Sequence, residues 1–215
     1  MRCDKKAMLL YAVTDRAWVG TLSLYQQVEL ALKNGATCVQ LREKELDGDA
    51  FLAEATALAK LCKEYGVPFI VNDNVEIAIK SGADGIHVGQ EDMLAADVRA
   101  QVGNGMIVGV SAHTVAEALE AVKNGADYLG LGAVFSTSTK SDVDLMPFET
   151  LRAICAAVDV PTVAIGGISG ENILHLSGSG VDGVAVVSAI FGAEDPGAAT
   201  AALRTLAEKL VGVRE

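Results

Sequence analysis

Positive charge is scarce in this sequence. It has 17 lysine and arginine residues against 28 aspartate and glutamate residues, which gives a net charge of −11 at neutral pH. A protein that holds nucleic acid through a broad basic surface needs the opposite balance, so we expect no nucleic-acid partner. If the chain binds an anion, the positive charge must come from a few clustered side chains or from a metal ion.

Long apolar runs and paired cysteines are also missing. No segment approaches the ~20 apolar residues that cross a membrane. The apolar stretch near the N-terminus ends at Thr14 without a signal-peptide cleavage pattern. The four cysteines form no CxxC pair and no metal-ligand spacing, which favours buried free thiols. We therefore expect a cytoplasmic protein with no membrane partner.

Apolar residues, in contrast, are abundant and follow two alternating patterns. They make up 51% of the chain, enough for a large core. Short β-branched runs alternate with stretches of helical spacing, such as residues 23–35 and 114–125. The expected strands are 8–15, 38–44, 68–73, 85–90, 106–112, 128–134, 161–168 and 183–190. Nearly continuous apolar strands with short connections are typical of parallel strands buried on both faces.

A four-residue pattern recurs after every second helical stretch. Its second residue is always glycine, which suits the left-handed position at a helix end. The copies are Asn34–Thr37, Ser81–Asp84, Asn124–Asp127 and Ser179–Asp182. Two strand–helix units per copy predict a single α/β domain over residues 1–215, a (β/α)8 TIM barrel. An open doubly wound sheet is the alternative, but it would normally have fewer strands.

Active sites of such barrels lie at the C-terminal ends of the strands, so polar residues there are the candidates for chemistry. Gln40, Arg42 and Lys44 alternate along the second strand and point to one side. Burying charges is costly unless an anion pairs with them, which favours an anion site over a surface ion-pair network. His87 can face the barrel mouth, and His113 can serve catalysis or begin the next helix.

Two carboxylates follow the next strands. Asp73 and Asp92 stand at neighbouring strand ends. Each alone is best explained as a solvated loop residue or a helix N-cap. Two carboxylates facing a phosphate site instead suggest Mg²⁺, which is held by few protein oxygens together with substrate phosphates.

A second set of polar residues follows the last three strands. Residues 134–142 read VFSTSTKSD, with five hydroxyl side chains and one lysine. A solvated loop is the alternative to a phosphate pocket here. Gly166, Gly167 and Ser188 match the usual phosphate site of barrels, although a tight turn would also need the glycines.

Two anion sites are therefore predicted. One combines Arg42, Lys44 and Lys140 with a carboxylate-bound metal. The other combines hydroxyl groups of residues 134–142 with the loops after the last two strands. A metal-bound polyphosphate beside a monophosphate suggests the joining of two phosphorylated substrates, with pyrophosphate as the leaving group.

At these residues the sequence resembles the thiamine phosphate synthase (thiamine-phosphate pyrophosphorylase) family. The matching stretches, in the family's order, are YAVTDR, VQLREK, PFIVNDN, ADGIHVGQEDM, GVSAHT, ADYLGLGAVFSTSTK, AIGGI and VVSAI. The resemblance covers nearly the whole chain. It implies a (β/α)8 transferase of thiamine biosynthesis that couples hydroxymethylpyrimidine diphosphate to thiazole phosphate.

The resemblance also implies roles for individual residues. Those that would bind the pyrimidine diphosphate are Gln40, Leu41, Arg42, Glu43, Lys44, Asn72, Ser111 and Lys140, and of these Arg42, Lys44, Ser111 and Lys140 would be catalytic. Those that would bind the thiazole phosphate are Thr137, Ser138, Thr139, Gly167, Val187 and Ser188. Asp73 and Asp92 would hold Mg²⁺. The implied mechanism is dissociative, with the metal and the cations stabilising charge on the departing pyrophosphate.

The sequence departs from the family pattern at three positions. Ala133 and Ser136 stand where the family usually has proline, and Asn74 stands where arginine is often found. These changes affect loop stiffness and leave every ligand-binding residue in place.

Two other functions are compatible with a barrel of this kind. A related thiazole tautomerase would not need the diphosphate-binding residues. A catalytically dead barrel that senses thiazole or thiamine phosphate would act through a partner. The sequence shows no loss of charged site residues that would indicate such a sensor. Self-association into a homo-oligomer is compatible with each of these functions.

Overall fold

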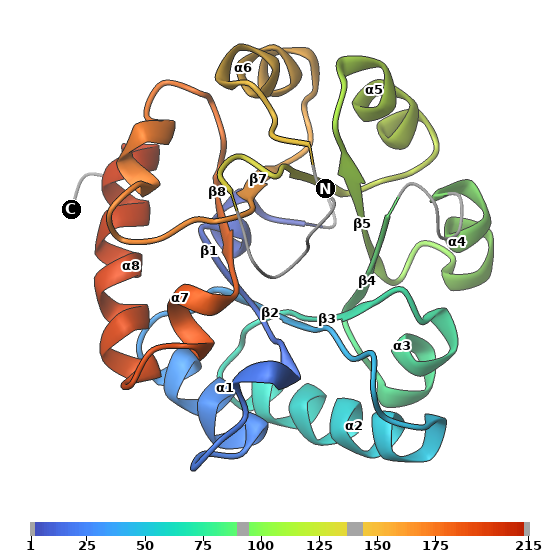
Figure 1. Ribbon diagram of the computed structural model, residues 1–215. Helices are drawn as coiled ribbons and strands as arrows, with labels where there is room; N and C mark the ends of the chain where they lie inside the picture. The colour runs from blue at the N-terminus through green and yellow to red at the C-terminus, as the bar shows by residue number, and fades with distance from the viewer. Residues whose placement is uncertain (1–2, 90–94, 137–143, 213–215) are drawn as a thin grey trace.

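Eight parallel strands close into a barrel in chain order, with helices around the outside (Figure 1). The computed structural model describes residues 3–89, 95–136 and 144–212. The strands are β1 (Leu10–Val13), β2 (Cys38–Leu41), β3 (Phe69–Asn72), β4 (Gly85–Val88), β5 (Ile107–Ala112), β6 (Tyr128–Leu131), β7 (Thr162–Ile165) and β8 (Gly183–Val186). The predicted TIM barrel is therefore confirmed.

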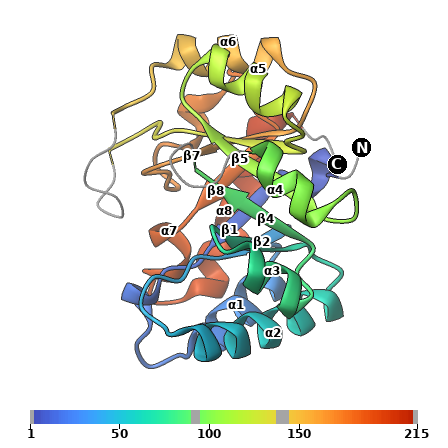
Figure 2. The same cartoon turned by 90° about the vertical axis from the view of Figure 1, so that its right-hand side faces the viewer.

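The helices form the outer layer, above and below the strands in the side view of Figure 2. They are α1 (Leu24–Lys33), α2 (Gly48–Glu64), α3 (Val75–Ser81), α4 (Ala95–Val102), α5 (Val115–Lys123), α6 (Phe148–Ala157), α7 (Ser188–Phe191) and α8 (Pro196–Val211). Short 3₁₀ turns are η1 (Lys5–Met8), η2 (Arg16–Trp18) and η3 (Ile173–Leu176). Within the described ranges, no helix combines the length and the apolar character that a membrane span requires.

Every predicted strand is longer than the observed one, and the last predicted strand includes the start of a helix. Residues 183–190 form a continuous apolar run, but β8 ends at Val186 and α7 begins at Ser188. An apolar run does not distinguish a buried strand from a buried helical turn, so the pattern could not show this break. The break turns the chain at the C-terminal end of the barrel.

The barrel interior and the outer layer have separate apolar cores. Inward side chains such as Tyr11 and Tyr128 fill the barrel, together with Cys3 and Met8 from the N-terminal segment. The outer core joins the strands to the helices. The four cysteines are free, as predicted, and burial raises the pKa of Cys3 to about 12.

The four-residue repeat ties every second strand at its N-terminal end. Its glycines all have positive φ, from 72° to 103°. The last side chain of each copy accepts a hydrogen bond from the backbone N–H of a residue in an odd-numbered strand. The pairs are Thr37 with Leu10 (2.8 Å), Asp84 with Phe69 (2.9 Å), Asp127 with Val108 (3.0 Å) and Asp182 with Thr162 (2.9 Å). The repeat therefore stabilises the end of the barrel opposite the C-terminal ends of its strands.

Among the aspartates of the four-residue repeat, Asp127 should contribute the most to the stability of the fold. It is nearly buried and also forms an ion pair with Arg99. We expect Asp127→Ala to lower the free energy of unfolding by about 2–4 kcal/mol, because it leaves a mostly buried guanidinium without its counterion. The exposed Asp84 makes the same kind of backbone contact, so Asp84→Ala should lower the free energy of unfolding by only about 1 kcal/mol. Urea titration of both variants measures the two losses. Equal losses would contradict a special role for the ion pair.

Candidate active site

A cavity of about 200 Å³ lies at the C-terminal ends of the strands. Inward side chains of the strands line its floor, including Tyr11, Gln40, His87 and Ser111. The loops after β6, β7 and β8 line its wall. The cavity is thus at the end of the barrel where the sequence predicted the site, and His87 faces it.

A chain of hydrogen bonds crosses the cavity floor. Gln40 Nε2 donates to the Tyr11 hydroxyl at 2.8 Å, and the Tyr11 and Tyr128 hydroxyls are 2.8 Å apart. The Tyr128 hydroxyl lies 2.9 Å from Nδ1 of His87. The other ring nitrogen, Nε2, lies 3.0 Å from Oγ of Ser111. Five side chains from five strands thus form one network, hereafter the floor chain.

The amide at one end gives the floor chain a direction. The nitrogen of Gln40 can only donate, so the Tyr11 oxygen accepts there and its proton is directed to Tyr128. Tyr128 then donates to Nδ1 of His87. A neutral His87 consequently carries its proton on Nε2 and donates to Ser111. The Ser111 hydroxyl proton therefore points away from Nε2 of His87.

Glycines and burial keep the rings of the floor chain in place. A Cβ atom added at Gly109 would lie 2.1 Å from the Tyr128 ring, and one at Gly130 would lie 3.1 Å from His87. Burial raises the pKa of Tyr11 and of Tyr128 well above the usual value, so both hydroxyls stay protonated. These tyrosines belong to no motif that predicts a site residue; the available signal was their inward position in their strands.

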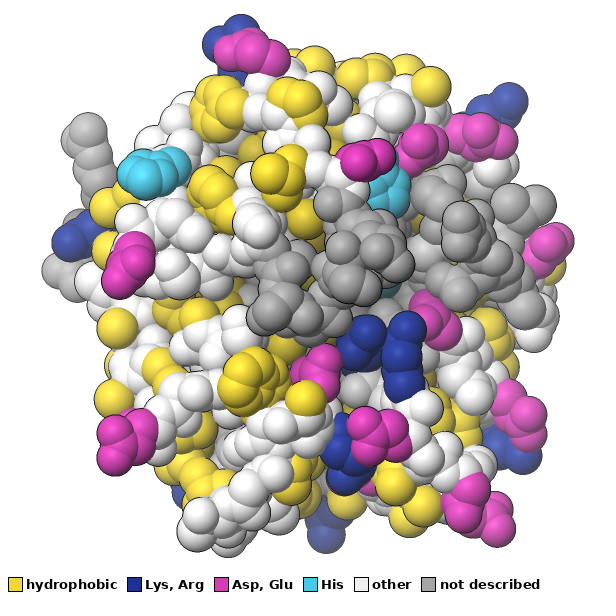
Figure 3. All heavy atoms as spheres, viewed as in Figure 1, with side chains coloured by type: hydrophobic (Ala, Val, Ile, Leu, Met, Phe, Trp, Pro, Cys, Tyr) yellow, Lys and Arg dark blue, Asp and Glu magenta, His cyan; other side chains and the backbone are white. Residues whose placement is uncertain are grey.

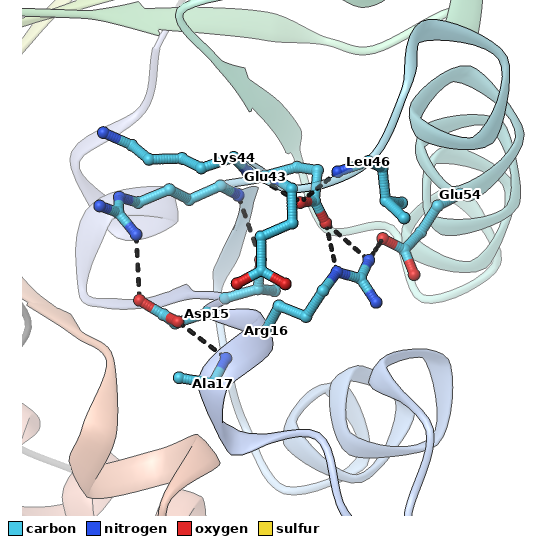
Figure 4. Close-up of polar contacts among 10 residues, drawn as sticks. Asp15, Arg16, Ala17, Glu43, Lys44, Leu46 and Glu54 are labelled. Atoms are coloured by element: carbon cyan, nitrogen blue, oxygen red, sulfur yellow. Dashed lines mark hydrogen bonds and ion pairs between the residues drawn. The ribbon is translucent and has the colours of Figure 1, made fainter.

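Positive charge lies at the rim of the cavity. Arg42 lines the cavity, and its Nη1 lies 3.0 Å from Asp15 Oδ2. Lys44 is exposed, and in Figure 4 its side chain extends away from the Arg16 guanidinium. Figure 3 shows dark blue lysine and arginine side chains together near the centre of this face.

Two of the predicted pyrimidine-diphosphate ligands point away from the cavity. Leu41 is fully buried in the outer core. The side chain of Glu43 is 1% exposed, and its carboxylate pairs with Arg16. Alternation along an extended chain explains this, because residues 41 and 43 face the side opposite to 40 and 42. Both side chains therefore have partners within the protein.

Asn72 and Asp73 form a polar corner after β3. Asn72 lines the cavity, and its Nδ2 donates to the Asp73 carboxylate. Asp73 is exposed, and its backbone N–H donates to the His87 carbonyl at 2.8 Å. Among the described residues, Asp73 is the non-glycine with positive φ, at 60°. Such backbone strain is typical of functional positions.

The described part of the chain holds no cluster of three or more histidine, cysteine or acidic residues for a metal. Mg²⁺ does not require one, because it commonly uses one or two carboxylates together with waters and substrate phosphates. The exposed carboxylate of Asp73 fits that donor set.

The predicted thiazole-phosphate residues come together only in part. Gly167, Val187 and Ser188 all line the cavity. Gly167 has φ 63°, and a Cβ atom there would lie 2.2 Å from the Ser136 carbonyl oxygen, so the loop after β6 packs against a turn that requires glycine. The predicted residues outside the described part of the chain are Asp92, Thr137, Ser138, Thr139 and Lys140.

His113 lies between the end of β5 and the start of α5, beside the cavity. His113 lines the cavity and also contacts Glu117 in the first turn of α5, with Nδ1 3.3 Å from the carboxylate. The pKa of Glu117 is lowered overall; burial raises it, but the hydrogen bonds from His113 and Thr114 outweigh that effect. His113 therefore lies one residue before Thr114, the N-cap of α5, and borders the site.

Comparisons with known proteins agree with this geometry. The family described as thiamine monophosphate synthase matches residues 10–190. The chain is 46% identical over 204 residues to a thiamine-phosphate synthase of Ruminiclostridium cellulolyticum, covering 95% of this chain and 94% of that protein. It is 48% identical over 191 residues to a thiamine-phosphate synthase of Clostridioides difficile, covering 89% of this chain and 91% of that protein.

Structural similarity extends over the same length. The structure matches thiamine phosphate pyrophosphorylase from Pyrococcus furiosus with a TM-score of 0.88 and 38% identity, covering 97% of this chain and 99% of that chain. None of these three relatives is named a tautomerase or a sensor. The chain therefore belongs to the thiamine monophosphate synthase family and is a transferase that forms thiamine phosphate.

Proposed function

We propose that the cavity joins hydroxymethylpyrimidine diphosphate to thiazole phosphate, with the pyrimidine on the floor chain and the phosphates at the rim. The observation that supports this most is the division of the cavity. Its floor consists of neutral hydrogen-bonding groups, whereas Arg42 and the glycine turn after β7 belong to its border. Such a division suits a substrate with a neutral heteroaromatic ring and a highly charged tail.

The pyrimidine ring would be oriented by Gln40, Asn72 and Ser111. All three line the cavity and carry amide or hydroxyl groups. Since Ser111 accepts a hydrogen bond from His87, its own proton is directed toward another acceptor, such as a ring nitrogen. A ring held in this way would keep its exocyclic methylene group at the entrance, next to the incoming thiazole.

The diphosphate would bind at the rim, where Arg42, Lys44 and Lys140 would face its oxygens. Asp73 and Asp92 would hold Mg²⁺, which when bound supplies positive charge to the leaving group. The bond between the methylene carbon and the diphosphate oxygen would break first, with its electron pair leaving on pyrophosphate. The thiazole nitrogen would then attack that carbon, so no protein nucleophile is needed.

The thiazole phosphate would bind where Gly167, Val187 and Ser188 border the cavity, together with residues 137–139. Loops after the seventh and eighth strands form the usual phosphate site of such barrels. Because both substrates carry phosphates that do not cross membranes, the cytoplasm is the expected location of the reaction.

A direct assay tests the proposal. Purified protein would be mixed with both substrates and Mg²⁺, and thiamine phosphate and pyrophosphate would be measured with and without a chelator. We expect equal amounts of the two products, loss of both with chelator, and recovery with excess Mg²⁺. Product formation that ignores the chelator would contradict the metal assignment. Absence of product under every condition would contradict the proposed reaction.

A further inference from the structure

Arg16, in the turn after β1, is held by two carboxylates from other elements (Figure 4). Its Nε donates to Oε2 of Glu43 at 2.7 Å, and its Nη2 lies 2.6 Å from the same oxygen. Nη2 also pairs with Glu54 of α2. The guanidinium thus joins the loop after β1, the loop after β2 and the outer helix layer.

The second oxygen of Glu43 organises its own loop. Oε1 accepts hydrogen bonds from the backbone N–H groups of Lys44 at 2.8 Å, Glu45 at 2.6 Å and Leu46 at 3.1 Å. Burial raises the pKa of Glu43, but the hydrogen bonds from Arg16 and from the backbone of Glu45 and Leu46 outweigh it and leave the pKa below the usual value. Glu43 is therefore an ionised carboxylate around which residues 43–46 turn.

This turn presents the two predicted cations that follow β2, Arg42 and Lys44. Arg42 and Lys44 flank Glu43, so fixing the Glu43 side chain on one side of the chain directs both neighbours to the other. Arg42 is also tied to the loop after β1, since its backbone N–H donates to Thr14 Oγ1 at 3.1 Å and its guanidinium pairs with Asp15. The two loops are thus joined at successive residues.

We propose that Arg16 and Glu43 are positioning residues for the diphosphate site, which hold Arg42 and Lys44 in place without contacting the substrate. The inference rests on the proposed function, because that function makes these cations diphosphate ligands. Long cationic side chains lose conformational freedom when they bind an anion, and a preformed turn reduces that loss. Glu43 therefore acts through its neighbours.

The test separates the two substrates. We expect Arg16→Ala to raise KM for the pyrimidine diphosphate, and Kd for inorganic pyrophosphate with Mg²⁺, by about tenfold or more. KM for thiazole phosphate should stay within about twofold, because its predicted ligands lie on other loops. Calorimetry on the intact protein gives Kd, and circular dichroism at the assay temperature gives the folded fraction.

If Arg16→Ala unfolds, Glu43→Gln serves instead. The same KM and Kd should then rise by about threefold, since the amide oxygen of glutamine still accepts N–H groups.

Glu54→Gln is the matched control. It removes the other carboxylate on Arg16 and leaves the contacts of Glu43 with its loop intact, so both KM values should stay within about twofold. Unchanged pyrophosphate affinity in Arg16→Ala, or an equal rise of both KM values, would overturn the inference. A wild-type protein that binds no pyrophosphate would contradict the proposed function itself and remove the inference with it.

Discussion

Replacing Asp73 by asparagine is expected to lower kcat/KM by about 10²–10³-fold with little loss of stability. The change removes the negative charge that we assign to Mg²⁺ and keeps the shape of the side chain. Asparagine also tolerates the left-handed backbone that Asp73 adopts at φ 60°, so the loop should keep its geometry. The loss should therefore come from the metal site and not from refolding of the loop.

Two further variants separate charge from backbone strain. Asp73→Gly should lose as much activity, yet raise the free energy of unfolding by up to about 1 kcal/mol, because glycine adopts positive φ without strain. Glu76→Gln removes an exposed carboxylate three residues away, which pairs with Lys80, and should leave activity unchanged. Steady-state rates over a range of Mg²⁺ concentrations and urea titrations provide the readouts. Full turnover by Asp73→Asn with unchanged Mg²⁺ dependence would remove the metal assignment.

The barrel could be predicted because its signal is repeated. Four copies of one short pattern mark pairs of strands, and the hydrogen bonds of Asp84, Asp127 and Asp182 show why the last position of a copy is polar. A loop or a single helix has no such repetition. This is why the boundary between β8 and α7 within residues 183–190 was missed.

The direction of side chains relative to the cavity follows from alternation along the chain. Alternation placed Gln40 and Arg42 toward the cavity, as observed. The family resemblance assigned the whole stretch 40–44 to the ligand, although alternation sends Leu41 and Glu43 to the other side. A family resemblance assigns a whole stretch of consecutive residues to the ligand, whereas side-chain direction shows which of these residues face the cavity.

Contacts across the barrel interior lie beyond sequence reasoning of this kind. Tyr11 and Tyr128 stand on β1 and β6, which are not neighbours in the sheet, and are 117 positions apart in the chain. Periodicity shows that each points inward, but not which inward side chains meet. The height of each residue along the tilted strands decides this, and it depends on the register of all eight strands.

Tyr128→Phe is expected to lower kcat by about 100-fold, because it removes the central hydroxyl of the floor chain. The change deletes the donor to His87 Nδ1 and the acceptor for Tyr11. His87 is then no longer restricted to the Nε2–H form that donates to Ser111, so the Ser111 hydroxyl can turn away from the pyrimidine. Tyr11→Phe should cost less, about 3- to 10-fold, since Tyr128 can still donate to His87.

Exchange of the exposed Tyr25 for phenylalanine is the control for the chemical change itself and should leave kcat unaltered. Stability should fall by about 1–3 kcal/mol in Tyr128→Phe, because a buried hydrogen-bonding group is lost. Activity should be measured under conditions where each variant is fully folded. Equal kcat values for wild type and Tyr128→Phe would contradict a role for the floor chain in orienting Ser111.

The tautomer can be observed directly, because the chain has three histidines and ¹⁵N NMR distinguishes their ring nitrogens. His113→Gln and His175→Gln would assign the His87 signals. We expect Nε2–H in the wild type and a mixture in Tyr128→Phe. Burial keeps the pKa of both interior tyrosines well above the usual value, so the neutral hydroxyls persist as pH rises and the wild-type tautomer should not change between pH 7 and about 9.5. A tautomer change without loss of kcat would show that the pyrimidine does not depend on the Ser111 proton, whereas a parallel change in both would identify the direction of the floor chain as part of catalysis.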